Sequence, residues 1–143
     1  MQRILIATDG SEGAERALAV AVELTKKMDG QLIILTVSAQ EFTEQQNRYI
    51  ESIGLTEGDA LEAVSHGILS QAARYARDAG VQSVETKLKA GGPAKKIVET
   101  VSSDKIDMLV VGRRGRGRLE GLILGSVSQE VAATAPCIVT IVP

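Results

Sequence analysis

Residues 4–12 read Ile-Leu-Ile-Ala-Thr-Asp-Gly-Ser-Glu, an apolar run that ends in a polar break containing glycine. A short, continuous apolar run rich in β-branched residues is typical of a strand that is buried on both faces, as in a parallel sheet. From Glu12 to Leu24 the apolar residues recur at helical spacing along one face, and Gly30 follows as a C-terminal stop. This stretch therefore predicts a strand, a tight turn and a helix in direct succession.

The same alternation of strand and helix continues along the chain. Further strands are predicted at residues 32–37, 84–89, 108–111 and 137–142. Helices are predicted at residues 60–79, 93–101 and 126–134, and a polar surface excursion with one short helix at residues 38–59. This pattern predicts an α/β fold: a five-stranded, parallel, open sheet with helices on both faces, Rossmann-like in architecture. Apolar and polar residues alternate at positions 84–89, which indicates an exposed edge strand.

The composition is that of one globular domain, residues 1–143, with 24% charged residues and a formal net charge of −2. This charge balance leaves no broad basic face for a phosphate backbone, and three aromatic residues are too few for a platform on which bases stack. Together they exclude a general nucleic-acid binder. The sequence shows no signal peptide and no membrane span, so we expect a cytoplasmic protein. A single cysteine excludes an internal disulfide and a multi-cysteine zinc site.

Two of the predicted strands end in polar, glycine-containing turns, at residues 8–11 and at residues 112–117. Open α/β sheets bind ligands beyond the carboxyl ends of their strands, where the strand order reverses. If these two strands are neighbours, both turns face one crevice. Asp9 could accept hydrogen bonds from ribose hydroxyls or hold a divalent cation beside phosphates. The local sequence favours a structural use, in which Asp9 caps the first helix with Glu12 three positions on.

The second turn opens a glycine-rich segment whose backbone amides could approach an anion closely. The segment carries four arginines: Arg113, Arg114, Arg116 and Arg118. Gly125 and Ser126 then begin a helix whose first amides favour phosphate. The structural alternative is a capping box from Ser126 to Gln129, with the arginines on a solvated loop. Neither the P-loop pattern nor the dinucleotide fingerprint is present, which argues against P-loop hydrolysis and NAD binding.

The other reactive side chains are interpreted as structural. The apolar face of the predicted helix that carries His66 includes Val64 and Tyr75. His66 lies off this face, which indicates a surface or boundary position. Cys137 is expected to be a buried, inert thiol within the last strand. Asp104 is interpreted as a helix-end residue. No carboxylate pair, Ser-His arrangement or metal-ligand spacing stands out, so no catalytic residue is assigned.

Four separated segments resemble the universal stress protein family in order and spacing, specifically its ATP-binding branch. Residues 4–12 look like the family's first strand and turn, residues 92–97 like its third turn and helix start, and residues 135–137 like the entry to its last strand. The family's nucleotide motif, G-x2-G-x9-G-[S/T], is matched by Gly112, Gly115, Gly125 and Ser126. The resemblance covers nearly the whole chain except residues 38–59, where the family is variable.

The resemblance implies a fold like that of the adenine nucleotide alpha hydrolases and a nucleotide site that can be carried over position by position. The adenine and ribose side would be lined by Ala7, Thr8 and Asp9, with Val37 meeting adenine through its backbone. The ribose and phosphates would be wrapped by Val111, Gly112, Arg114 and Gly115. The phosphates would be held at the helix start by Gly125, Ser126, Val127 and Ser128.

The implied ligand is ATP, with AMP or ADP as alternatives and a Mg²⁺ or Mn²⁺ ion accompanying the nucleotide. Asp9 is the candidate ligand for that ion, acting through Mg-ATP. Arg113 departs from the family, in which many members have a small serine at this position. Together with Arg116 and Arg118, it should favour a polyphosphate.

Three functions stay open at this point. The first is an ATP-binding protein of stress response or regulation, in which ATP is a bound ligand that is hydrolysed slowly or not at all. The second is an adenine-nucleotide-dependent enzyme of the ATP pyrophosphatase or ligase type, and the third is a nucleotide-free dimerisation module. The last strand, Cys137 to Val142, carries no charge. In the strand order of the family this strand forms a sheet edge, so we expect a homodimer paired through it.

Overall fold

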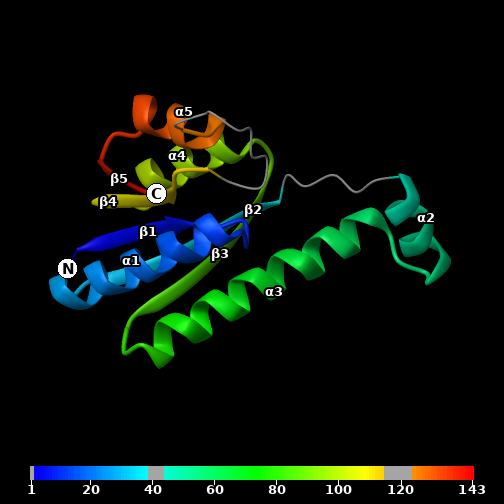
Figure 1. The fold of residues 1–143 in the computed structure, drawn as a ribbon, viewed down its shortest axis with the longest axis horizontal. Coiled ribbons are helices and arrows are strands. Elements are labelled where there is room, and N and C mark those ends of the chain that lie inside the picture. The colour runs from blue at the N-terminus through cyan, green and yellow to red at the C-terminus, as the bar shows by residue number, and fades with distance from the viewer. Residues whose placement is uncertain (1, 39–43, 115–123) are drawn as a thin grey trace.

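The computed structural model describes residues 2–38, 44–114 and 124–143 of the 143-residue chain. Its elements follow in the order β1 (Arg3–Ala7), α1 (Glu12–Met28), β2 (Gln31–Ser38), α2 (Glu44–Ser52), α3 (Glu57–Asp78), β3 (Val84–Ala90), α4 (Pro93–Ser103), β4 (Met108–Gly112), α5 (Ser126–Thr134) and β5 (Ile138–Val142). Strands and helices alternate as predicted, and the short helix expected after β2 is present as α2, directly before α3 (Figure 1). Among the described helices, none is both long and apolar enough to cross a membrane.

All strand pairs in the sheet are parallel, and the strand order is β3-β2-β1-β4-β5. The predicted α/β fold with a five-stranded parallel sheet is therefore confirmed, and β3 lies at an edge as its alternating sequence predicts. β1 lies at the centre between β2 and β4, so the strand order reverses there. Since Ile6 of β1 pairs with Val110 of β4, the polar turns that follow these two strands lie at the same edge of the sheet.

The helices cover both faces of the sheet, α1 and α3 on one face and α4 and α5 on the other (Figure 1). Successive residues of β1 point to opposite faces. Ile4 and Ile6 pack with α1 and α3, whereas Leu5 packs in the cluster that contains Ile97 of α4 and Val131 of α5. All three β1 side chains are fully buried. Each such burial contributes roughly 1.5–3 kcal/mol, so the central strand anchors both layers of helices.

The ends of α1 differ from the prediction. Ser11 is the N-cap, and its Oγ accepts a hydrogen bond from an amide of the first turn at 3.2 Å. Asp9 does not cap the helix, because its Oδ1 accepts a hydrogen bond from the Ser11 amide at 2.9 Å and closes the preceding turn. At the other end the left-handed residue is Asp29, with a φ of 49°, rather than Gly30. Glycine suits position 30 for another reason: a Cβ there would lie 2.6 Å from the Gln2 carbonyl oxygen.

The helices after β2 also differ in detail from the prediction. The expected short helix is α2, but α3 begins earlier than expected because Thr56 and Asp59 form a reciprocal capping box. Val64 and Tyr75, expected on the buried face, are 40% and 47% exposed. The core contacts of α3 come instead from a narrow stripe: Leu69, Ala72, Ala73 and Ala76. The first half of α3 extends past the sheet toward α2 (Figure 1).

Two side chains interpreted as structural are found in the expected places, and one is not. His66 is exposed, and its Nε2 lies 3.5 Å from a carboxylate oxygen of Glu62. Asp104 is the C-cap of α4 and pairs with Lys87 of β3. Cys137 precedes β5 and is only half-buried, so the prediction of a fully buried thiol within the strand is wrong. Partial burial nevertheless raises the pKa of this thiol.

Candidate functional site

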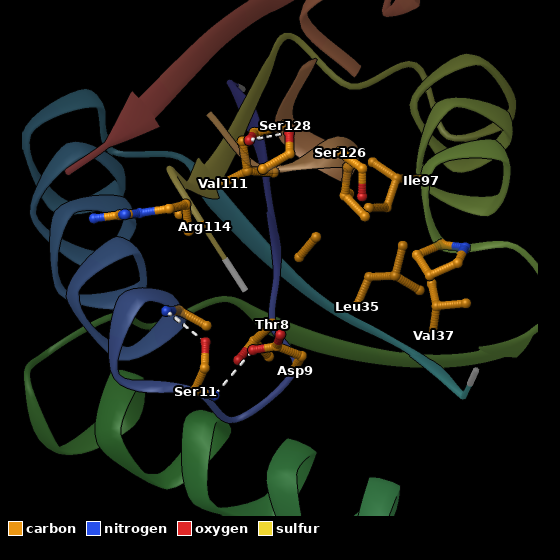
Figure 2. Close-up of a pocket in the computed structure, with 16 residues that line it drawn as sticks. Thr8, Asp9, Ser11, Leu35, Val37, Ile97, Val111, Arg114, Ser126 and Ser128 are labelled. Atoms are coloured by element: carbon orange, nitrogen blue, oxygen red, sulfur yellow. Dashed lines mark hydrogen bonds between the residues drawn. The ribbon is translucent and has the colours of Figure 1, made fainter. Parts of the chain in front are cut away.

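A cavity of about 230 Å³ lies at the carboxyl ends of β1 and β4, where the strand order reverses. Figure 2 shows the side chains that line it. They come from the turn after β1, the ends of β2 and β4, and the first turns of α1, α4 and α5. The lining residues are Ala7, Thr8, Asp9, Ser11, Ala14, Leu35, Val37, Pro93, Ile97, Val111, Gly112, Arg114, Gly125, Ser126, Val127 and Ser128.

The structure brings together eleven of the twelve residues that the resemblance assigned to a nucleotide site. These are Ala7, Thr8, Asp9, Val37, Val111, Gly112, Arg114, Gly125, Ser126, Val127 and Ser128. The twelfth, Gly115, lies outside the described residues, as do Arg116 and Arg118. The shared location is an observation, whereas the contact of each residue with a nucleotide stays a prediction.

Five lining residues were missed: Ser11, Ala14, Leu35, Pro93 and Ile97. Two signals in the sequence could have found some of them. Leu35 precedes Val37 by two positions on β2 and therefore points to the same face of the sheet. Pro93 and Ile97 are four residues apart on α4 and share one helix face. Neither signal predicts that α4 lies over the end of β2. It is this position that adds the Pro93 and Ile97 face of α4 to the cavity wall.

Hydrogen bonds fix the turn after β1. The Thr8 amide donates to the Leu35 carbonyl oxygen at 2.9 Å, and the Thr8 carbonyl oxygen accepts from the Thr36 hydroxyl at 3.0 Å. The Thr8 hydroxyl oxygen accepts from the Gly10 amide at 3.2 Å. Gly10 has a φ of 79°, a conformation that glycine adopts without strain. Thr8 and its partners therefore hold the start of the loop that carries Asp9 against β2.

Close backbone packing joins β4 to α1 below the cavity. A Cβ at Gly112 would lie 3.0 Å from both the carbonyl carbon and the carbonyl oxygen of Gly13. A Cβ at Gly13 would lie 2.7 Å from the Arg114 carbonyl oxygen. Gly112 was predicted to wrap the ribose and phosphates, and in the structure it also allows the strand to approach the helix. No local sequence signal marks Gly13 for this packing, because its partners are 99 or more positions away along the chain.

The carbonyl oxygen of Arg113 connects the end of β4 to the start of α5. It accepts a hydrogen bond from the Gly125 amide at 2.8 Å and one from the Ser128 hydroxyl at 2.7 Å. Ser128 is buried, and its hydroxyl oxygen also lies 3.1 Å from the Gly125 carbonyl oxygen. The Arg113 amide donates to the Val142 carbonyl oxygen at 2.7 Å. Arg113, which directly follows β4, is therefore anchored to both β5 and α5.

No side chain of the described residues caps the N-terminus of α5. Its N-cap is Gly125, so the capping box of Ser126 and Gln129, which was the structural alternative to an anion site, is not formed. Gln129 reaches outside the helix instead, where its Nε2 donates to the Leu124 carbonyl oxygen at 2.8 Å. The first amides of a helix have no carbonyl partner within the helix. The first residues of α5 line the cavity, no described side chain caps their amides, and the helix dipole makes this end electropositive.

The cavity has an apolar wall opposite its polar turns. Leu35, Val37 and Ile97 lie together on one side in Figure 2, and Thr8, Asp9 and Ser11 lie apart from them. The Arg114 side chain extends toward α1 rather than toward the apolar wall (Figure 2). An apolar wall with convergent polar groups is the usual character of a small-molecule site. The described residues contain no cluster of three or more His, Cys, Asp or Glu side chains that could hold a metal ion by themselves.

Comparison with known proteins assigns the family. The family model described as "Universal stress protein family" matches residues 1–143. This chain belongs to the universal stress protein family. A universal stress protein of Staphylococcus haemolyticus, SH1215, is 33% identical over 142 residues, which cover 99% of this chain and 84% of that protein. The family part of the resemblance is therefore confirmed.

Solved universal stress proteins share the fold. UspA from Lactobacillus plantarum superposes with a TM-score of 0.82 at 22% identity, covering 99% of this chain and 97% of that one. A universal stress protein in complex with cAMP is 30% identical, with a TM-score of 0.74 and the same two coverages, 99% and 97%. The protein from Archaeoglobus fulgidus in complex with dAMP is 21% identical, with a TM-score of 0.73 and coverages of 100% and 98%.

Proposed function

We propose that this universal stress protein binds ATP in the cavity at the ends of β1 and β4 and uses it as a regulatory ligand. In this proposal adenine lies against the apolar wall of Leu35, Val37 and Ile97. The ribose lies near Asp9, and the phosphates lie at the start of α5. ADP and AMP would occupy the same site with fewer phosphate contacts.

The observation that carries the proposal is the uncapped N-terminus of α5 in the wall of the cavity. The N-cap is Gly125, so among the described residues no capping side chain competes with a ligand for the first amides. Ser126 is exposed, and with Val127 and Ser128 it lines the cavity. A helix N-terminus without a competing cap is suited to phosphate, because backbone amides and the helix dipole act together there. By contrast, Ser11 caps the nearby start of α1.

The known structures support an adenine nucleotide. The neighbour solved with cAMP is 30% identical to this chain, and cAMP contains the same adenine and ribose as ATP. The choice of ATP over a monophosphate rests on the spacing of Gly112, Gly115, Gly125 and Ser126 and on the basic residues between them. Longer phosphate chains gain more from both features than a single phosphate does.

The residues present fit a magnesium ion that is bound mainly by the nucleotide. Mg²⁺ usually keeps several waters and takes one or two carboxylates plus phosphate oxygens. Asp9 is the one carboxylate among the described lining residues, so it could supply a protein ligand. Such an ion would neutralise phosphate charge. Mn²⁺ would be bound by the same groups.

We propose slow or no hydrolysis. Phosphoryl transfer to water needs a positioned water as well as charge stabilisation. The described lining residues include no histidine, and Asp9 is their only acid. The Oδ1 atom of Asp9 already accepts the Ser11 amide. ATP would then act through the conformation it stabilises rather than through turnover.

Native mass spectrometry of the purified protein tests nucleotide binding and hydrolysis together. We expect the spectrum to gain the mass of ATP on titration, and the bound mass to persist for hours with Mg²⁺ present. The absence of an ATP adduct at saturating concentration would contradict binding. Conversion at about 1 s⁻¹ or faster, the low end of ordinary enzyme rates, would favour the enzyme hypothesis instead.

A further inference from the structure

A second cavity, of about 390 Å³, lies between α3 and the edge strand β3. It shares no lining residue with the candidate nucleotide site. We call it the α3–β3 groove, and its lining residues are His66, Leu69, Ser70, Ala73, Arg74, Arg77, Thr86 and Leu88.

The α3–β3 groove has an apolar floor and a polar rim. Leu69 and Ala73 are buried, and Leu88 is half-buried, so the floor presents carbon atoms to the cavity. The rim follows one face of α3, because its polar residues recur every three or four positions: His66, Ser70, Arg74 and Arg77. At this spacing neighbouring Cβ atoms are roughly 5–6 Å apart. Thr86 adds a hydroxyl from β3.

The two arginines of the rim form no ion pair within the described part of the chain. Neither Arg74 nor Arg77 forms a salt bridge with any described residue. At the other end of the rim, the carboxylate of Glu62 contacts His66. Two guanidinium groups one turn apart, beside hydroxyl donors, match the oxygens of a phosphate group, because each guanidinium offers a planar pair of donors.

We propose that the α3–β3 groove binds a small phosphate monoester with an apolar body. Arg74 and Arg77 hold the phosphate, Ser70 and Thr86 donate hydroxyl hydrogen bonds, and the body covers the apolar floor. A cavity that is only basic would suit any anion. Because this groove combines an apolar floor with a basic rim, it selects a molecule that has both an apolar body and a phosphate.

The edge of β3 is a poorer template for an added peptide strand. Its residues at alternate positions are charged: Glu85, Lys87 and Lys89. Charged side chains are a usual means of blocking edge-to-edge pairing. The small-molecule ligand is therefore the better match to the observed residues.

Phenyl phosphate is a suitable probe, because it combines a phosphate monoester with a flat apolar ring. In ¹⁵N-resolved NMR titrations we expect saturable shifts at the amides of Ser70, Arg74 and Thr86. The double variant Arg74→Gln/Arg77→Gln should weaken binding at these amides at least about tenfold. Both arginines are exposed, and glutamine is a good helix former, so the unperturbed part of the spectrum should show an intact fold.

The double variant Lys27→Gln/Arg48→Gln is the matched control, since it removes two positive charges from other exposed helix positions. Its affinity for phenyl phosphate at the groove should stay within about twofold of the wild type, because distant surface charges are screened. Three results would overturn the proposal: no saturable shift in the groove, shifts confined to residues 126–128, or an equal loss in the control variant. Equal affinity for benzoate would also overturn it, because the groove would then not select phosphate.

Discussion

Two glycines determine how closely the walls of the candidate nucleotide site approach each other. Gly112 and Gly13 meet where β4 ends beside the first turn of α1, and side chains at these positions would meet backbone atoms at 3.0 Å and 2.7 Å. Backbone atoms cannot rotate out of the way as a flexible side chain can. The close approach of β4 and α1 therefore requires a residue without a side chain, glycine, at both positions.

Gly112→Ala should destabilise the protein by roughly 1–3 kcal/mol, the usual range for overpacking a closely packed site. Urea unfolding followed by circular dichroism measures this change. Gly67→Ala is the matched control, because Gly67 lies within α3 and a Cβ there meets nothing within 4 Å. The control should be stabilised by up to about 1 kcal/mol, the helix-propensity difference between the two residues. An unchanged or raised stability of Gly112→Ala would show that the contact is not restrictive.

Among the elements, β3 and α4 are joined by an ion pair on the sheet face opposite α3. Lys87 of β3 pairs with Asp104 at the end of α4, and the Ser103 hydroxyl donates to the same carboxylate at 3.0 Å. Partial burial by itself raises the pKa of Asp104, but the hydrogen bonds from Lys87 and Ser103 outweigh it and hold this pKa below its ordinary value. The hydrogen bond with Asp104 raises the pKa of Lys87.

Asp104→Asn should therefore lower the free energy of unfolding at pH 7 by about 1 kcal/mol. The folded-state pKa of Asp104 is depressed, so its contribution is present above the ordinary aspartate pKa and is lost as the pH falls through the folded-state value. The stability difference between wild type and variant should thus vanish in acid. Glu23 provides the control, because its carboxylate forms an exposed ion pair with the Lys26 ammonium group at 3.6 Å. Glu23→Gln should change the free energy of unfolding by less than about 0.5 kcal/mol. A difference between wild type and Asp104→Asn that persists undiminished in acid would contradict this account.

The sequence predicts elements well where a strong local signal has no competitor. The continuous apolar runs predict β1, β2 and β4, and the glycines and Pro93 mark the start of α4. Caps were predicted less well, because adjacent polar residues compete for the same role. Asp9 and Ser11 both suit the start of α1, and the turn uses the Asp9 carboxylate to hold the Ser11 amide. At α5 the sequence was compatible with a capping box of Ser126 and Gln129, but the box is not formed and the Ser128 hydroxyl donates instead to the distant Arg113 carbonyl oxygen.

The candidate site was predictable to the extent that it follows from strand order. Once β1 and β4 are neighbours, Asp9 and Gly112 must end at one edge of the sheet. The packing of Gly13 against Gly112 and the place of Ile97 in the wall depend on how helices dock on the sheet. That docking is set by side chains from many parts of the sequence, so no single segment encodes it.

At the scale of the whole molecule, we still predict a homodimer through β5. The strand lies at the sheet edge, and Ile138 is 62% exposed. Val139 and Ile141 pack partly against the core, so Ile138→Lys is a cleaner test than a change at either of them. Sedimentation at micromolar concentration should show a dimer for the wild type and a monomer for Ile138→Lys. A wild type of 15.1 kDa at every concentration would contradict the dimer, and a dimeric Ile138→Lys would move the interface elsewhere.

The central proposal is that phosphates of ATP bind at the uncapped start of α5. Ser126→Asp places a carboxylate at the first helical position, where it should repel phosphate while interacting favourably with the helix dipole. Loss of binding in this variant would therefore not come from loss of the helix. Gln71→Glu adds the same charge at an exposed position of α3 and serves as the matched control.

Calorimetric titration of wild type, Ser126→Asp and Gln71→Glu with ATP and with adenosine tests this proposal most directly. We predict that Ser126→Asp lowers the affinity for ATP at least about tenfold, or about 1.4 kcal/mol, and leaves the affinity for adenosine within about twofold. Gln71→Glu should bind both ligands as the wild type does. Equal ATP affinity in wild type and Ser126→Asp, or no saturable ATP binding by the wild type, would contradict the account.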